Sequence, residues 1–158
     1  MRDWRLWLLP SVAVIVIDQF SKHWIVQAFS LGESRPFTSF FNLARHHNTG
    51  AAFNFLADAG GWQRLFFIVL ATVASGVIVF LLRKHGRETL FSLALCLVLG
   101  GALGNLIDRI RWGYVVDFLD FYYGNYHWPA FNVADMAITG GVMLLVLDSI
   151  RKPDNKKS

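Results

Sequence analysis

The sequence predicts a mostly α-helical integral membrane protein with four transmembrane helices and a small β-rich segment at the extracytoplasmic membrane surface. Of its 158 residues, 54% are hydrophobic and 16% are charged, whereas an average soluble domain has about 25% charged residues. The apolar residues form long blocks, and a helix needs about 20 mainly apolar residues to span a membrane. We therefore expect helices at about residues 6–25, 65–82, 89–107 and 131–150, all within one membrane-embedded domain, 1–158.

Charged residues interrupt two of these helices. Residues 65–82 and 89–107 carry no charged side chain, whereas the first helix contains Asp18 and Lys22 and residues 131–147 contain Asp135. The first segment also suits a cleavable signal peptide, because Arg2 and Arg5 precede its apolar run. However, Asp18 stands where a small-residue cleavage site should lie, so we interpret this segment as a membrane helix.

Lys and Arg residues set the expected orientation. They are concentrated beside both chain ends and in the short loop 83–88, which predicts that these parts face the cytoplasm. The long segments at about 28–61 and 108–130 then face outward. The basic residues behind the net charge of +4 flank helices and do not form one patch, so we expect membrane lipids as partners and no nucleic acid.

The outward segments read as extended chain. Residues 37–43 are aromatic and strand-like, 48–50 form a turn signal before the apolar residues 51–55, and 113–121 are rich in β-branched and aromatic residues. A plain hairpin joining two helices fits the first segment equally well. Asp117 lies among apolar neighbours, which favours its protonated form. The alternative, an ordinary solvated loop aspartate, suits Asp120 at least as well as Asp117.

Polar residues on the first and third helices have the spacing of one helix face. Asp18 and Lys22 are four residues apart and can neutralise each other at the bilayer edge, where unpaired charges are costly. Asn105, Asp108 and Arg109 also share a face, at the outer end of their helix. They could form hydrogen bonds with a site, or Asp108 could simply form an ion pair with a nearby Arg.

The fourth helix begins with an acid in its first turn. Asn132 is the expected N-cap and Asp135 would be the third helical residue, as in a variant of the capping box. An acid at the membrane boundary is also a functional hypothesis. If Asp117 and Asp135 lie close together, their repulsion lets them share one proton, and such a pair can hydrolyse an amide with an activated water.

Other hydrolytic chemistries fit the sequence less well. It contains no Gly-x-Ser-x-Gly and no His-Glu-x-x-His motif, and Cys96 lies within an apolar helix. We therefore expect no metal and no cofactor.

Five blocks of the sequence resemble, in the same order, those of the bacterial lipoprotein signal peptidases, the signal peptidase II family. The blocks are 18–22 (DQFSK), 48–53 (NTGAAF), 100–109 (GGALGNLIDR), 115–118 (VVDF) and 131–135 (FNVAD).

The resemblance implies an aspartic endopeptidase of the bacterial inner membrane that removes signal peptides from diacylglyceryl-modified prolipoproteins, cleaving N-terminal to the lipidated cysteine. It implies a catalytic dyad of Asp117 and Asp135 toward the extracytoplasmic face, and inhibition by the cyclic peptide globomycin. We expect a monomer. The resemblance also implies supporting or substrate-binding roles for five residues, Asn48, Gly50, Asn105, Arg109 and Asn132. It implies structural roles for three others, Asp18, Lys22 and Asp108.

Two other functions fit the composition. A small proton-coupled transporter also uses membrane acids, but it favours acids near the midplane and repeat symmetry, and no repeat is visible. A membrane scaffold would use its polar residues only to hold helices together.

Overall fold

The computed structural model describes residues 3–50 and 61–151. The elements in chain order are the 3-10 turn η1 (Trp4–Trp7), α1 (Leu8–Ala28), β1 (Ser34–Thr38), β2 (Phe41–Asn48), α2 (Trp62–His85), α3 (Thr89–Arg111), β3 (Val115–Tyr123), β4 (Tyr126–His127) and α4 (Val133–Arg151). Four helices and a small antiparallel sheet confirm the predicted fold class. The strand-like residues 51–55 and the basic residues beyond Arg151 lie outside the described residues.

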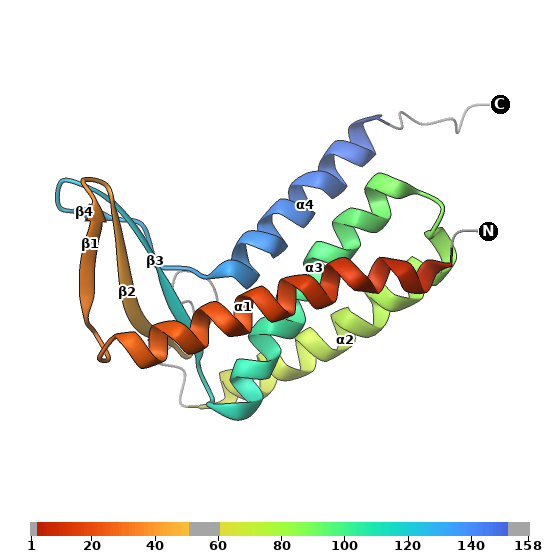
Figure 1. Ribbon diagram of the computed structural model, residues 1–158. Coiled ribbons are helices and arrows are strands. Elements are labelled where there is room, and N and C mark those ends of the chain that lie inside the picture. Colours follow the sequence, from red (N-terminus) through yellow and green to blue (C-terminus); the bar gives the residue numbers. More distant parts are fainter. Residues whose placement is uncertain (1–2, 51–60, 152–158) are drawn as a thin grey trace.

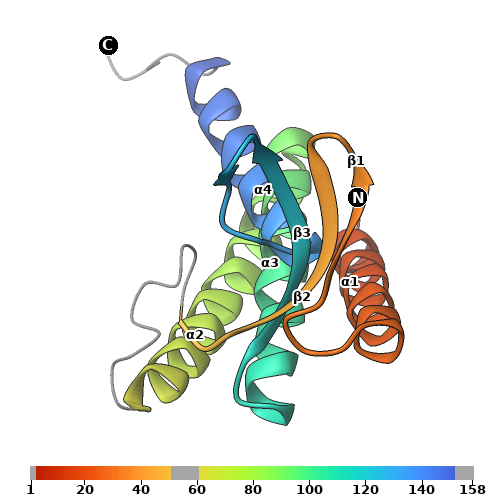
Figure 2. The ribbon, with the colours of Figure 1, turned by 90° about the vertical axis from the view of Figure 1, so that its left-hand side faces the viewer.

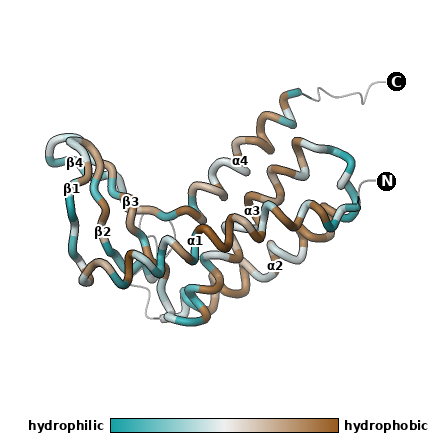
Figure 3. The backbone as a smooth tube through the Cα atoms, viewed as in Figure 1, coloured by the Kyte–Doolittle hydropathy of each residue, from teal (hydrophilic) through white to brown (hydrophobic). Residues whose placement is uncertain are grey.

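The helices are arranged around α3, and α1, α2 and α4 each pack against it (Figure 1). Three helices, α2, α3 and α4, are long and apolar enough to cross a membrane. The helix α1 has a similar length of 21 residues, but Asp18 and Lys22 in its second half lower its hydropathy and it does not meet the same criterion. Figure 3 shows apolar residues along the helices and hydrophilic residues in the sheet and at the opposite end.

Glycines allow the close packing of α3. A Cβ atom at Gly100 would lie 2.7 Å from Val14 Cβ on α1, and one at Gly104 would lie 2.7 Å from Asp18 Oδ2. On α4, a Cβ at Gly141 would lie 2.6 Å from Val98 Cγ2. Small residues at these positions let helix backbones approach each other, as is common in membranes.

The sheet lies at one end of the bundle (Figure 2). Its four strands are antiparallel and follow the order β1-β2-β3-β4. A turn at Ser39 and Phe40 divides the strand-like residues 37–43 between β1 and β2, so they belong to two strands of a hairpin. The start of α1, the end of α4 and the loop 86–88 lie together at the end opposite the sheet (Figure 1).

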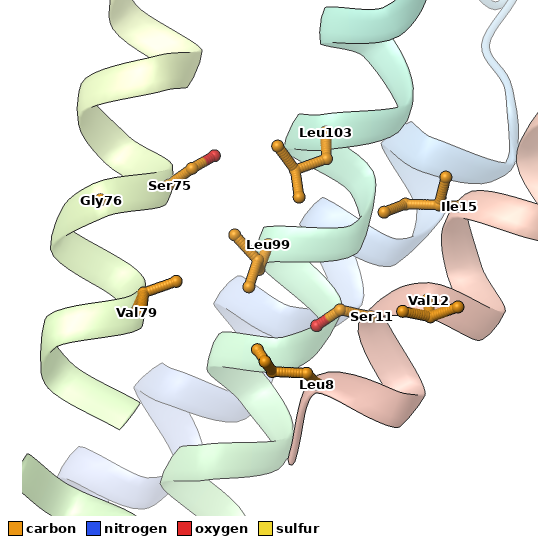
Figure 4. A pocket seen from close by; sticks show the side chains of 9 residues that line it. All are labelled: Leu8, Ser11, Val12, Ile15, Ser75, Gly76, Val79, Leu99 and Leu103. Carbon is orange, nitrogen blue, oxygen red and sulfur yellow. The ribbon is translucent and has the colours of Figure 1, made fainter. Parts of the chain in front are cut away.

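A cavity of about 450 Å³ lies between α1, α2 and α3 and is lined mainly by apolar side chains (Figure 4). The hydroxyl of Ser11 donates to the Cys96 carbonyl at 2.8 Å, and Ser75 lines the opposite wall from α2. None of the site residues predicted from the sequence lines this cavity.

Candidate active site

Asp117 and Asp135 lie at the end of the bundle that carries the sheet. Asp117 is in the middle of β3 and is only 3% exposed, because its neighbours Val116 and Phe118 belong to a buried apolar cluster with Ile25 of α1. Asp135 lies in the first turn of α4. A strand and the start of a helix therefore each supply one of the two acids.

Asn132 connects the two acids. Its Nδ2 donates to Asp117 Oδ1 at 2.7 Å, and its Oδ1 accepts from the backbone N–H of Asp135 at 3.0 Å. The backbone N–H of Asn132 donates in turn to Asp135 Oδ2 at 3.2 Å. This reciprocal pair of bonds confirms the predicted capping box. Because the Asn132 side chain is fully buried, it fixes the start of α4 relative to Asp117.

A second chain of hydrogen bonds approaches Asp117 from β2. The Nδ2 of Asn48 donates to Asp117 Oδ2 at 2.9 Å, and its Oδ1 accepts from the Gly50 N–H at 2.9 Å. The carbonyl of Gly50 accepts from Arg109 Nη2 at 2.7 Å. The Arg109 guanidinium also lies 4.9 Å from the centre of the Phe67 ring on α2. Arg109 therefore holds the Gly50 turn against the helices.

Asn105 links Asp135 to a buried cation. Its Nδ2 donates to Asp135 Oδ1 at 2.8 Å, and its Oδ1 accepts from Lys22 Nζ at 2.9 Å. The same ammonium group lies 2.8 Å from Asp18 Oδ2, which confirms the predicted pair, and 2.9 Å from Asp108 Oδ2. The alternative of an ion pair between Asp108 and a nearby Arg is wrong in its partner, because α1 packs on α3 and brings Lys22 to Asp108.

All eight supporting and structural residues predicted from the sequence thus gather around the acid pair. Reasoning from the sequence missed Gln19, whose Nε2 donates to Asp108 Oδ1 at 2.8 Å and to the Gly104 carbonyl at 3.2 Å. The signal for it was its place between Asp18 and Lys22. Within residues 3–50 and 61–151, no group of three or more His, Cys, Asp and Glu side chains is arranged to hold a metal ion.

Asp120 is buried, although the sequence suggested a solvated loop aspartate at this position. It is 5% exposed, accepts from Asn42 Nδ2 at 2.8 Å, and pairs with His127, so it is not a solvated loop aspartate. The backbone N–H groups of Phe118 and Leu119 both donate to the Phe131 carbonyl, at 3.0 and 2.9 Å. Two residues opposite one is the pattern of a β-bulge, which can re-aim side chains.

The surroundings of Asp117 favour its neutral form. Burial raises the pKa of its carboxyl to about 7, and the negative charge of Asp135 acts in the same direction. The hydrogen bonds from Asn48 and Asn132 and the charge of Lys22 oppose this effect. At neutral pH the pair can therefore hold one proton on Asp117.

Fold and site together define a membrane protein that keeps a buried acid pair at one end of its helices. A sequence model of the family described as "Signal peptidase (SPase) II" matches residues 11–151. The chain is 57% identical over 147 residues to the lipoprotein signal peptidase of Cupriavidus taiwanensis and 58% identical over 147 residues to that of Cupriavidus necator. Each match covers 93% of this chain and 84% of the relative.

A solved structure described as a bacterial membrane enzyme has the same fold. It superposes with a TM-score of 0.86 at 33% identity, over 97% of this chain and 92% of the other. The chain therefore belongs to the signal peptidase II family, whose members are peptidases.

Proposed function

We propose that this protein is an aspartic endopeptidase that removes signal peptides from diacylglyceryl-modified prolipoproteins, cleaving N-terminal to the lipidated cysteine. Its relatives at 57% and 58% identity are named lipoprotein signal peptidases, which supports the substrate class. The observation that carries the mechanism is that one buried residue, Asn132, donates to both carboxylates, from its side chain to Asp117 and from its backbone N–H to Asp135. We infer that the two acids act as a single catalytic unit, sensitive to globomycin.

The proposed reaction starts with one proton on the pair, on Asp117, and a negative charge on Asp135. The N-terminus of α4 and the Asn105 amide stabilise that charge. Asp135 takes a proton from water as the water oxygen attacks the carbonyl carbon, and Asp117 gives its proton to the carbonyl oxygen. The amide nitrogen then takes the proton from Asp135 as the C–N bond breaks. Asp117 regains a proton from the diol, which restores the starting state.

The other predicted residues support this unit without reacting. Asn48 and Asn132 donate hydrogen bonds to Asp117, and Asn105 donates one to Asp135, so these amides orient the carboxylates. Gly50 and Arg109 hold the β2 end in place. The buried group of Asp18, Lys22 and Asp108 has a structural role, because it joins α1 to α3.

The protein is also proposed to be a monomer of the inner membrane with both termini in the cytoplasm. The sheet and Asp117 would then lie on the extracytoplasmic side. A proton-coupled transporter is disfavoured by the position of Asp117, which lies on a strand beyond the helices and not near the middle of the bilayer.

The test is Asn substitution of each acid, assayed on a diacylglyceryl-modified precursor in detergent or lipid. Asp117→Asn and Asp135→Asn should each abolish cleavage while precursor binding is kept, since Asn cannot accept and return the proton. The double variant should be no worse than either single one, because the acids act as one unit. Glu33→Gln is the matched control, an acid in an exposed ion pair with Arg35. Substantial cleavage by either Asp variant would refute the mechanism.

A further inference from the structure

A second cavity, of about 590 Å³, adjoins Asp117 on the side of the sheet. Its walls come from the α1–β1 turn, from β1, β2 and β3, and from residues 127–130. No residue that lines it belongs to any of the four helices. The cavity therefore lies beyond the helices and borders one of the two proposed catalytic acids. Its volume is within the range of about 300–1,000 Å³ that is usual for ligand sites.

A fixed imidazole lines this cavity. His127 Nδ1 lies 2.9 and 3.1 Å from the two carboxylate oxygens of Asp120, and the ring stacks on Tyr122 with 5.3 Å between centroids. Asp120 is held from its other side by Asn42. The His127 side chain is nevertheless 54% exposed. A carboxylate that occupies Nδ1 sets the ring orientation and leaves Nε2 for another partner.

The other lining residues are of two kinds. Leu31, Trp128, Pro129 and Ala130 are apolar, whereas Arg45, His46, His47 and Asn48 are polar. Arg45 Nη1 donates to the carbonyls of Val26 and Phe29 at 3.1 and 2.9 Å, which fixes this guanidinium beside the end of α1. Its Nε is buried, and it has no hydrogen-bond partner within the part of the chain that the structure describes. Such a mixed lining, on the sheet and not between the helices, suits a polypeptide segment of mixed sequence.

We propose that this cavity binds the first residues of the mature polypeptide, on the carboxyl side of the bond that is cut, and that His127 is a specificity-determining residue there. This inference rests on the proposed function and adds which part of the substrate the sheet holds. When the scissile bond is at the acid pair, the apolar signal peptide and the lipid chains remain in the bilayer. The chain that follows the lipidated cysteine is the only part that extends beyond the helices, where this cavity lies.

Two lipopeptides test the proposal. Both carry the same signal peptide and diacylglyceryl cysteine; one continues with several mature residues, and the other ends in an amide at that cysteine. The wild type should cleave the longer one with the higher kcat/KM. His127→Ala should reduce the ratio of the two kcat/KM values by about threefold to tenfold, the effect of one hydrogen bond. His127→Gln should restore part of the ratio, because its amide can still form a hydrogen bond.

His23→Ala is the matched control, since His23 is exposed on α1 and contacts Gln27, not the cavity. It should keep the wild-type ratio. Equal kcat/KM of the wild type for both lipopeptides would overturn the proposal, as would a loss in His127→Ala that is the same for both. If the wild type cleaves neither lipopeptide, the proposed function itself fails, and the inference fails with it.

Discussion

Replacing Asn132 by alanine should remove two interactions at once, the N-cap of α4 and a hydrogen bond to Asp117. Above a pH of about 7 Asp117 loses the proton that the acid pair must share, so cleavage by the wild type should fall tenfold for each further pH unit. Asn132 Nδ2 donates to the charged carboxylate at 2.7 Å and thereby opposes the raised pKa of Asp117. Without this donor the pKa of Asp117 rises further. The alkaline limb of the kcat–pH profile, where cleavage falls with rising pH, should therefore move to higher pH.

The size of this effect follows from the bond that is lost. A hydrogen bond to a charged group contributes about 1.5–3 kcal/mol, and 1.36 kcal/mol corresponds to one pH unit. The alkaline limb of kcat should therefore move upward by about one to two pH units. The lost N-cap should also lower the free energy of unfolding by about 1 kcal/mol. The assay is kcat against pH on a diacylglyceryl-modified lipopeptide, with thermal unfolding measured in the same detergent.

Asn48→Ala is the matched control, because Asn48 donates the other hydrogen bond to Asp117 at 2.9 Å but caps no helix. Its alkaline limb should also move upward, without the loss of the α4 cap. If both variants keep the wild-type limb, Asp117 is not the group whose ionisation limits cleavage, and the reasoning is refuted.

Three further predictions concern the fold. Lys22→Met should lower the free energy of unfolding by about 3–5 kcal/mol, because it leaves the carboxylates of Asp18 and Asp108 buried without their cation; unchanged thermal unfolding would contradict this. Gly141→Ala should lower the unfolding temperature, since its Cβ would meet Val98, whereas Gly140→Ala has open space and should not. A reporter fused at about Lys84 should indicate the cytoplasm, and an outside signal would reverse the topology.

Asp135 and the capping box could be predicted because their signals are local, whereas the family resemblance, and not a local signal, selected Asp117 over Asp120. Asp135 follows Asn132 by three residues, and an acid at the start of an apolar helix is conspicuous in a single sequence. Asn48 and Asp117 are 69 residues apart, and no spacing rule connects them. The family resemblance, and not any local pattern, brought Asn48 into the predicted site.

Packing between elements explains what the sequence could not predict. Helical spacing places Asp108 near Arg109 and Arg111, but the contact of α1 with α3 gives it Lys22 as its partner. The bulge opposite Phe131 interrupts the simple alternation of β3, so Asp120 could not be recognised as buried. The turn at 39–40 contains no glycine, proline or asparagine, and the aromatic residues around it imitate one continuous strand.

The packing of α2 makes the active site sensitive to the thickness of the membrane. Among the described residues, α2 packs mainly on α3 and η1 and leaves most of its surface to lipid. Its uncharged part, residues 65–82, extends over about 27 Å, which nearly matches the hydrocarbon core of about 30 Å. Phe67 of this helix lies under the Arg109 guanidinium. A bilayer of different thickness changes the tilt that suits such a helix, and a change in the tilt of α2 would act on Arg109, the residue that holds the Gly50 turn beside Asp117.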